Sequence, residues 1–557
     1  MLKKIFIGFW AIFCFFVFTG TVYSESPNRS WEEAYDKKNI RHSSGMVTDS
    51  SADMLKLPSV LYRYPANPDF TIAKIQPTVE FGIPQLVPEY LSSGGPYGGW
   101  ARSFYGPDGK FYFTIGNHNR YAADAFLFTY DPATKTHSRI LSTKEVSGWS
   151  DSDYGDGKLH GDPVISPNGD MWLLTFWGPE PSLSDFGSSY FGGHLIFYNI
   201  FSKKSEYLGR PVSDDSWPAH VWDWERERLY AVGEWSRYYG KEGYGKFMIY
   251  DTKNRKVVFE GLPKTEGGEE IHWYHRSVLL DRETGIIYGT ESSPPYRFVS
   301  YNPATDKFLF QNARLSSPLR AWTKRKDPNR AFWIFDYDGN IYKFFPAEDR
   351  VEKIGKNWMN GTYIADIELS PSGRYLYYPV ASISSDYGFP IVQYDTQKNT
   401  KKVIAFLSEY YHREYGYGIQ GSYAVSLSQD GSSLFVQVNG RFCPGVRDKA
   451  YGRPAIFHIR IPSSERSEDF MYGDGNSDGR VDGLDYVIWV DNYGKLNPNG
   501  PADGDFNKDN KVDGLDYVIW VDNYGTNSGA SVSLGDFNND HRVDGLDYVI
   551  WVDNYGG

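Results

Sequence analysis

Short stretches in which apolar and polar residues alternate run through the chain from about residue 96 to residue 462. They include PDGKFYFTIG, PNGDMWLLTF, DGNIYKFF, PSGRYLYYPV and QDGSSLFVQV. Alternation with a period of two is typical of β-strands, and the Asp-Gly, Asn-Gly and Ser-Gly pairs are typical of hairpin turns. The pattern therefore predicts a mainly β fold built from a long series of antiparallel hairpins.

The hairpins belong to a larger repeating unit. In each unit one strand ends in an aromatic residue or histidine, and a turn and a second strand come after it. The seven occurrences are Tyr130-Asp131, Tyr198-Asn199, Tyr250-Asp251, Tyr301-Asn302, residues 342–345, Tyr394-Asp395 and residues 458–461. Units of this size hold about four short strands, which is typical of a β-propeller. We expect seven blades over residues 96–462, with six or eight as alternatives. Residues 25–95 form an N-terminal segment and are a candidate source of the strand that closes the ring.

The last part of the chain, residues 473–557, holds three near-identical segments that begin at Asp474, Asp505 and Asp536. Positions 1, 3, 5, 9 and 12 of each segment are Asp or Asn, and position 7 can offer its backbone carbonyl. Calcium prefers six to eight hard oxygen ligands, so the spacing predicts about three calcium sites. The expected ligands are Asp474, Asn476, Asp478, Arg480, Asp482 and Asp485, then Asp505, Asn507, Asp509, Lys511, Asp513 and Asp516, then Asp536, Asn538, Asp540, Arg542, Asp544 and Asp547.

Each loop runs into LDYVIWVDNYG, which predicts a short helix that is apolar almost all round and therefore buried. Position 12 is Asp rather than Glu, and no helix-forming run precedes the loops. In both respects the tail resembles the dockerin domain. That resemblance implies a small helical calcium-binding domain and a cohesin-like or other scaffold partner. The chain departs from the dockerin pattern in its third repeat, in Gly483-Leu484 at the usual Ser-Thr positions, and in Asp491-Asn492 in place of a basic pair. Calcium binding therefore carries over better than cohesin binding.

The N-terminus is typical of a secretory signal. Lys3 and Lys4 precede an apolar run over residues 5–18, and small and polar residues lead to Ser24. We expect residues 1–24 to be removed, which makes the protein secreted, extracellular or attached to the cell surface, with no membrane span afterwards. An uncleaved membrane anchor is the alternative. Cys443 is then the single cysteine of the mature chain, so an intramolecular disulfide is excluded.

Charge is concentrated in the tail, where residues 468–557 carry 18 acidic and 5 basic side chains. The rest of the chain is nearly neutral and has no basic stripe, which argues against nucleic acid as a partner. A polar stretch at residues 463–472 predicts a linker between the propeller and the tail.

Histidine is scarce, with 11 in the chain, so its positions carry information. His160, His220 and His275, the last followed by Arg276, lie beside three successive strands expected to line the propeller channel. Because equivalent strands surround one axis, we expect these four residues to converge at one mouth of the channel. Neutral imidazoles can accept a proton or bind a transition metal, and arginine can stabilise an enolate. The alternative for each histidine is packing within its own blade.

The blades resemble those of secreted carbohydrate-active propellers, including polysaccharide lyases. The resemblance implies a propeller that acts on or binds polysaccharide, as a lyase or glycoside hydrolase if it is an enzyme, with the tail providing calcium-dependent attachment to a partner. The alternative is a non-catalytic propeller for protein interaction or cell-surface assembly. Two Tyr-rich segments, residues 237–245 and 409–418, are candidates either for sugar binding or for packing between blades.

Overall fold

The computed structural model describes residues 46–62, 69–84, 97–182, 184–234, 246–380, 387–443, 451–466, 475, 483–496, 503–507 and 511–523. The expected signal at residues 1–24, the third calcium loop from Asp536 to Asp547 and the Tyr-rich segment at 237–245 lie outside these residues. Within the described ranges, no helix has both the length and the apolar character needed to cross a membrane.

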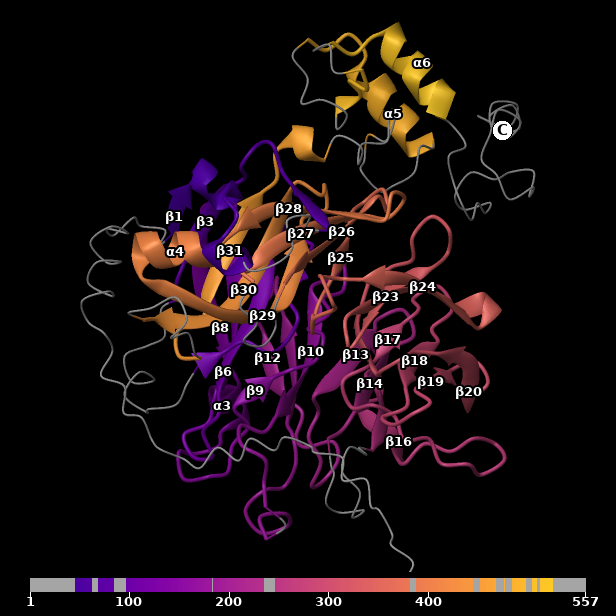
Figure 1. Cartoon of the computed structure of the whole chain (residues 1–557). Coiled ribbons are helices and arrows are strands. Elements are labelled where there is room, and N and C mark those ends of the chain that lie inside the picture. The colour runs from indigo at the N-terminus through magenta and orange to yellow at the C-terminus, as the bar shows by residue number, and fades with distance from the viewer. Residues whose placement is uncertain are drawn as a thin grey trace, which may run out of the picture.

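The described strands form seven sheets, which confirms a mainly β, seven-bladed propeller. Figure 1 shows the strands, coloured from indigo to orange along the chain. The first blade holds β4 (Tyr97–Gly98), β5 (Phe104–Tyr105), β6 (Phe111–Asn117), β7 (Ala125–Asp131) and β8 (Thr136–Ser142). The second holds β9 (Lys158–Leu159), β10 (Asp170–Phe176), β11 (Leu195–Asn199) and β12 (Ser205–Tyr207), and the third holds β13 (Ala219–Asp223), β14 (Arg228–Val232), β15 (Phe247–Asp251) and β16 (Lys256–Gly261).

The next three blades repeat this antiparallel arrangement. The fourth holds β17 (Leu279–Leu280), β18 (Ile287–Thr290), β19 (Arg297–Asn302) and β20 (Lys307–Arg314), and the fifth holds β21 (Leu319–Trp322), β22 (Phe332–Asp336), β23 (Asn340–Phe345) and β24 (Arg350–Lys356). The sixth holds β25 (Glu368–Leu369), β26 (Tyr375–Pro379), β27 (Pro390–Asp395) and β28 (Thr400–Phe406), with β2 (Phe70–Ile72) added in parallel to β28.

The seventh blade is built from both ends of the propeller sequence. It holds β29 (Tyr417–Leu427), β30 (Ser433–Phe442) and β31 (Ala455–Arg460), and β3 (Thr78–Gly82) pairs antiparallel with β31. The N-terminal β1 (Met46–Asp49) then pairs with β3. The ring is thus closed by hydrogen bonds between strands nearly 400 residues apart, so both chain ends must be in place before this blade is complete.

Short helices lie between the strands. They are α3 (Thr143–Ser147), α4 (Ser408–Tyr415) and the 3-10 turns η1 (Ala52–Leu55), η2 (Ser59–Leu61), η3 (Pro346–Glu348) and η4 (Ser463–Glu465). The last of these lies in the expected linker. Glu465 in η4 is buried, accepts hydrogen bonds from the backbone N–H groups of Lys74 and Ile75, and pairs with Lys402 at 2.9 Å. The beginning of the expected linker therefore packs against the propeller.

The hydrophobic core lies between neighbouring blades, which explains why many strands are apolar on both faces. In β10, Met171 and Leu173 pack against the first blade, whereas Trp172 and Leu174 pack against the third. Successive side chains of a strand point to opposite faces, so a sheet covered on both sides needs apolar residues at every position. The first and last blades share such a core as well, which confirms closure of the ring.

A buried glutamate reinforces the closing strand. Glu80 of β3 is fully buried and accepts hydrogen bonds from the Tyr130 hydroxyl at 2.6 Å and from His458 Nδ1 at 2.7 Å. Lys135 at 3.0 Å and Arg460 complete its surroundings. Burial alone raises the pKa of Glu80, but these hydrogen bonds and charges outweigh it and lower the pKa to about 2.

Two helices of the tail are described, α5 (Gly483–Asn492) and α6 (Gly514–Asn523). Figure 1 draws both in the orange-yellow colours of the C-terminal part of the chain. Phe506 is buried where the two helices meet, among Tyr486, Trp489, Tyr517 and Ile519. Part of the apolar surface of each helix is exposed, so burial of the remaining surface against the third repeat or a partner stays a prediction. The exposed apolar side chains are Leu484, Val487 and Val490 in α5 and Leu515, Val518 and Val521 in α6.

Candidate functional site

A cavity at the centre of the propeller is lined by residues of all seven blades. In blade order its principal lining residues are Trp100 and Arg102, His160 and Asp162, His220, Arg276, Arg320 and Trp322, Ala365, and Tyr423. These residues lie in or next to the first strand of each blade. The first strands therefore surround the channel, and side chains far apart in sequence share one cavity.

Three of the four residues singled out from the sequence line this cavity, namely His160, His220 and Arg276. His275 does not line it, because its ring turns toward Glu234, with Nε2 3.4 Å from the carboxylate. The same Nε2 accepts a hydrogen bond from Arg276 Nε at 3.1 Å. His275 thus orients the guanidinium of Arg276 instead of facing the cavity.

The two histidines in the cavity have different surroundings. The Nδ1 of His160 lies 2.9 Å from the carbonyl oxygen of Pro218, so Nδ1 carries the proton and Nε2 is left as an acceptor. In His220 neither ring nitrogen has a hydrogen-bond partner among the described residues, although the side chain is buried. Gly161 packs directly over the His220 ring, and a Cβ at residue 161 would lie 2.1 Å from Nδ1.

Both imidazoles are held neutral. Burial, aided by the positive charges of Arg276, Lys158 and Arg320, lowers the pKa of His160 well below 6.5. Burial alone lowers the pKa of His220 to about 3. A neutral imidazole with a free nitrogen can accept a proton or a hydrogen bond from a ligand in the cavity.

We expect neither His160 nor His220 to take up a proton between pH 5 and pH 8, because folding holds both pKa values below the usual 6.5. The measurement is the histidine ring carbon shift in NMR spectra of protein labelled at histidine, with His160→Asn and His220→Asn assigning the signals. A signal from either cavity histidine that titrates near pH 6.5 contradicts the neutral state.

Tyr363 and Tyr451 pack against Trp100 and Tyr423, which line the cavity together with Arg276. Burial raises the pKa of Tyr274, Tyr423 and Tyr451, and the positive charge of Arg276 opposes this rise. These tyrosines come from loops and strands of the fourth, sixth and seventh blades. Trp100 extends the group, with its ring stacked 5.9 Å from that of Tyr451. We call these six residues, Trp100, Tyr274, Arg276, Tyr363, Tyr423 and Tyr451, the channel mouth.

Sequence reasoning missed the aromatic part of the channel mouth, because its members share no local motif. One signal was available. Tyr274 precedes β17 by five residues, and Tyr363 precedes β25 by five residues. Aligning the blades on their first strands would have placed both side chains at the same end of the channel. Tyr423 and Tyr451 belong to the irregular last blade and give no such signal.

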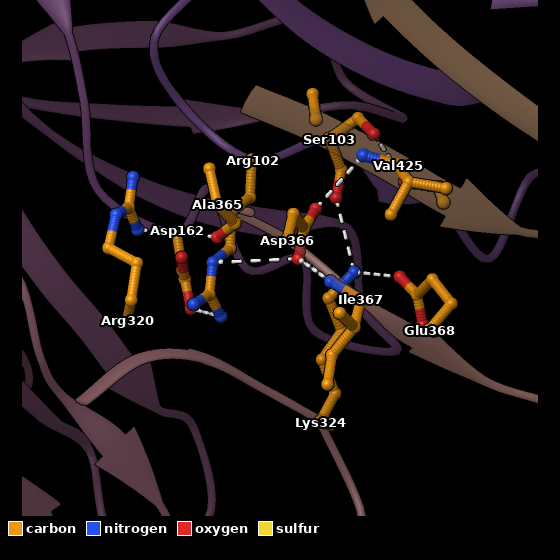
Figure 2. Close-up of polar contacts among 12 residues, drawn as sticks. Arg102, Ser103, Asp162, Arg320, Lys324, Ala365, Asp366, Ile367, Glu368 and Val425 are labelled. Atoms are coloured by element: carbon orange, nitrogen blue, oxygen red, sulfur yellow. Dashed lines mark hydrogen bonds and ion pairs between the residues drawn. The ribbon is translucent and has the colours of Figure 1, made fainter. Parts of the chain in front are cut away.

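A network of buried charges joins five blades beside the cavity (Figure 2). Arg102 lies between Asp162, at 3.4 Å, and Asp366, at 3.5 Å, and Lys324 pairs with Glu368. Asp366 also accepts hydrogen bonds from the backbone N–H groups of Ile367 and Val425. The network ties the first strands together, and the Nη2 of Arg102, which lines the cavity, has no hydrogen-bond partner among the described residues.

The Tyr-rich segment at 409–418 serves packing and not sugar binding. Its first part forms α4, which buries Tyr410, Tyr411 and Tyr415 in the core of the last blade. The hydroxyls of Tyr410 and Tyr415 donate hydrogen bonds to Asp49 at the edge of that blade. These rings are therefore unavailable to a ligand.

Among the residues that the structure describes, no group of three or more His, Cys, Asp or Glu side chains is arranged to hold a metal ion. The expectation of a transition metal in the channel thus stays a prediction.

In the tail, loop one is described at Gly475 and Asp485, where the backbone N–H of Gly475 donates to Asp485 at 2.8 Å.

More residues of the second repeat loop, which begins at Asp505, are described. The buried carboxyl of Asp516 accepts hydrogen bonds from the backbone N–H groups of Asn507 at 3.0 Å and Asp513 at 2.8 Å. Burial raises the pKa of Asp516, and the negative charge of Asp505 adds to this effect. Asp505 and Asp516, at positions 1 and 12 of the loop, are thus both buried carboxylates.

Comparison with known proteins adds little. No family model and no curated protein matches the chain. A solved structure titled "Crystal Structure of Mitotic Checkpoint Complex" is similar over 74% of this chain and 98% of that chain, with 9% sequence identity and a TM-score of 0.41. A similarity this weak supports no statement about function, and the propeller assignment rests on the strand pairing.

Proposed function

We propose that the propeller binds a polysaccharide at its channel mouth and that the tail binds calcium and attaches the protein to a partner outside the cell. The observation that carries the first part is the aromatic cluster of Trp100, Tyr363, Tyr423 and Tyr451, of which Trp100 and Tyr423 line the same cavity as Arg276. Aromatic faces pack well against the apolar faces of sugar rings, and a guanidinium donates several hydrogen bonds to sugar oxygens.

The same surroundings support chemistry on a bound sugar. His220 has two ring nitrogens without a partner among the described residues, and His160 has a free Nε2. Each neutral imidazole can accept a hydrogen bond from a sugar hydroxyl, and the guanidinium of Arg276 can bind a carboxylate or stabilise a negative charge that develops on the sugar. If the protein is an enzyme, the candidate activities are polysaccharide lyase and glycoside hydrolase.

For the tail, support comes from the oxygen-rich loops and from the arrangement of Asp505 and Asp516. In loop two, Asp505, Asn507, Asp509, Asp513 and Asp516 would hold calcium with their side chains and Lys511 with its carbonyl. The bound ion would supply the positive charge that lets these carboxylates share one place. Calcium would then stabilise the tail in a calcium-rich extracellular environment and make attachment depend on that ion.

Affinity electrophoresis through gels that contain single polysaccharides tests the proposal. We expect at least one gel to retard the protein. We also expect Arg276→Gln to weaken that binding about tenfold or more, because hydrogen bonds to a charged group contribute about 1.5–3 kcal/mol. The same samples, followed by ultraviolet absorbance of unsaturated products, separate a lyase from a binding protein.

Arg350→Gln is the matched control, because Arg350 is a partly exposed arginine on the outer strand β24 that pairs with Glu348 at 2.8 Å. Its binding should equal that of the wild type. The proposal is wrong if no polysaccharide retards the wild type, or if Arg276→Gln binds as tightly as Arg350→Gln.

A further inference from the structure

The cavity at the centre of the propeller is lined by more positive than negative groups. Three arginines contribute to the lining, Arg102, Arg276 and Arg320, whereas Asp162 is the one carboxylate among the described residues that line it. Beyond the effect of burial, the charges of Arg276 and Arg320 lower the pKa of the lining His160, so their field extends into the cavity. A cavity whose lining is dominated by one sign of charge attracts the opposite sign.

Two carboxylates outside the lining offset part of this charge. Asp366 lies 3.5 Å from Arg102, and Glu234 acts on Arg276. Burial raises the pKa of Asp366 to about 7, so this carboxyl is only partly ionised at neutral pH. Glu234 lies 3.4 Å from Nε2 of His275, whose ring does not line the cavity. The balance at the cavity itself therefore stays positive.

Arg102 has one nitrogen left for a ligand. Its side chain is 5% exposed, with Nη1 3.4 Å from Asp162 and Nε 3.5 Å from Asp366 (Figure 2). The guanidinium packs over the ring of Trp322, whose centre is 3.6 Å away. Nη2 has no hydrogen-bond partner among the described residues. Because three neighbours fix the planar guanidinium, this buried charged donor cannot turn to another acceptor, and leaving it unpaired costs free energy.

His220 presents a second donor without an acceptor. Its side chain is 2% exposed, and neither ring nitrogen has a hydrogen-bond partner in the part of the chain that the structure describes. A neutral imidazole carries one N–H, so whichever nitrogen holds the proton lacks an acceptor. Buried polar groups are almost always paired in folded proteins. Two unpaired donors, from Arg102 and His220, on the lining of one cavity therefore indicate an occupant that accepts hydrogen bonds.

The size of the cavity restricts this occupant. Its volume is about 20 Å³, and one water molecule needs roughly 10–15 Å³. The enclosed occupant is therefore about as large as a single water molecule. Water can accept both hydrogen bonds but leaves the positive charge in place, whereas a monatomic anion accepts both and also offsets the charge.

We propose that the central cavity binds a single small anion of the halide class, of which chloride is the abundant member, and that Arg102 Nη2 and the ring N–H of His220 donate hydrogen bonds to it. Arg276 and Arg320 add positive charge around the ion. These four residues belong to the first, third, fourth and fifth blades, so the anion joins separate blades at the axis and stabilises the closed ring. This site goes beyond polysaccharide binding and does not depend on it.

Crystals of the full-length protein, grown with calcium and soaked in sodium bromide, test the site directly. Bromide is close to chloride in size and is located by its anomalous scattering. We expect a bromide peak in the central cavity, within hydrogen-bonding distance of Arg102 Nη2 and a ring nitrogen of His220. A water molecule in the cavity with no bromide peak overturns the proposal.

Thermal unfolding tests whether the anion binds in solution. The full-length protein with calcium is heated in sodium chloride or sodium sulfate at equal ionic strength, and tryptophan fluorescence follows the propeller. Sulfate is polyatomic and too large for the cavity, although as a general salt it stabilises proteins more than chloride does. We expect the melting temperature to be higher in chloride by about 3 °C, because the bound ion stabilises the folded ring. An equal or higher melting temperature in sulfate contradicts the site.

His220→Leu removes the donor while Asp162 and Asp366 keep their partner Arg102. About tenfold more chloride should then be needed for the same rise in melting temperature, since a hydrogen bond to a charged group is lost. Arg350→Gln, on the outer strand β24, is the control and should respond to chloride as the wild type does. The same chloride response in both variants argues against the site, and if His220→Leu does not fold, the bromide soak of the wild type decides.

Discussion

Replacing Glu80 with glutamine is expected to lower the free energy of unfolding of the propeller by about 3 kcal/mol at neutral pH. The value follows from the fall of the Glu80 pKa from 4.5 to about 2 on folding, at about 1.4 kcal/mol per pKa unit. Glutamine has nearly the same shape but cannot pair with His458, Arg460 and Lys135. His458, Arg460 and Lys135 would then lose the negative charge on β3 with which they pair. Urea unfolding followed by tryptophan fluorescence measures the change.

The pH dependence of this loss has a defined sign. Because folding lowers the pKa of Glu80, its contribution is complete above the unfolded value of 4.5 and disappears as the pH falls toward about 2. The wild type and Glu80→Gln should therefore differ at neutral pH and converge in acid. Tyr130→Phe, which removes one hydrogen bond to Glu80 and keeps the ring, should cost about 1 kcal/mol. Equal stability of Glu80→Gln and wild type at neutral pH contradicts this role.

Removing calcium is expected to unfold the tail and leave the propeller folded. The tail holds carboxylates at ligand spacing in three loops, and an ion that binds only the folded form stabilises it by mass action. Circular dichroism should show a loss of helix on addition of a chelator. Isothermal titration should show about three calcium ions per chain. Unchanged helix content in chelator, or no heat with calcium, rules out the calcium tail.

Asp516→Ala and Lys511→Ala give the matched comparison within loop two. Asp516 is fully buried and supplies the carboxylate of position 12, so its removal should abolish one of the sites. Lys511 would bind calcium with its backbone carbonyl, which alanine keeps, so Lys511→Ala should bind as the wild type does. A loss of the same size in both variants would indicate general unfolding of the loop instead of a lost ligand.

The fold could be predicted because its signal is local and repeated. Hairpins such as that around Gly109 and strand ends such as Tyr130-Asp131 recur in every blade, and blades of this kind assemble into a ring. The pairing of β3 with β31 carries no local signal beyond the apolar Val79 and Phe81, because the partner strand is nearly 400 residues away. The burial of Glu80 could not be predicted either, because it depends on this pairing between distant strands.

The site could be predicted in part. His160, His220 and Arg276 could be assigned to the channel from the sequence because they lie next to the first strands. The direction of their side chains was not needed for this assignment. That approach failed for His275, since a side chain in a loop can turn toward a local partner such as Glu234.

Hydroxyl-radical footprinting of the full-length protein, with and without the polysaccharide that retards it most, tests most directly whether the channel mouth is the binding site. The account predicts that Tyr274, Tyr363 and Tyr451 are protected from oxidation by the glycan. Tyr62 and Tyr121, exposed and not part of the channel mouth, should be oxidised equally in both samples. Protection of Tyr62 or Tyr121 with no change at the three channel-mouth tyrosines would contradict the account.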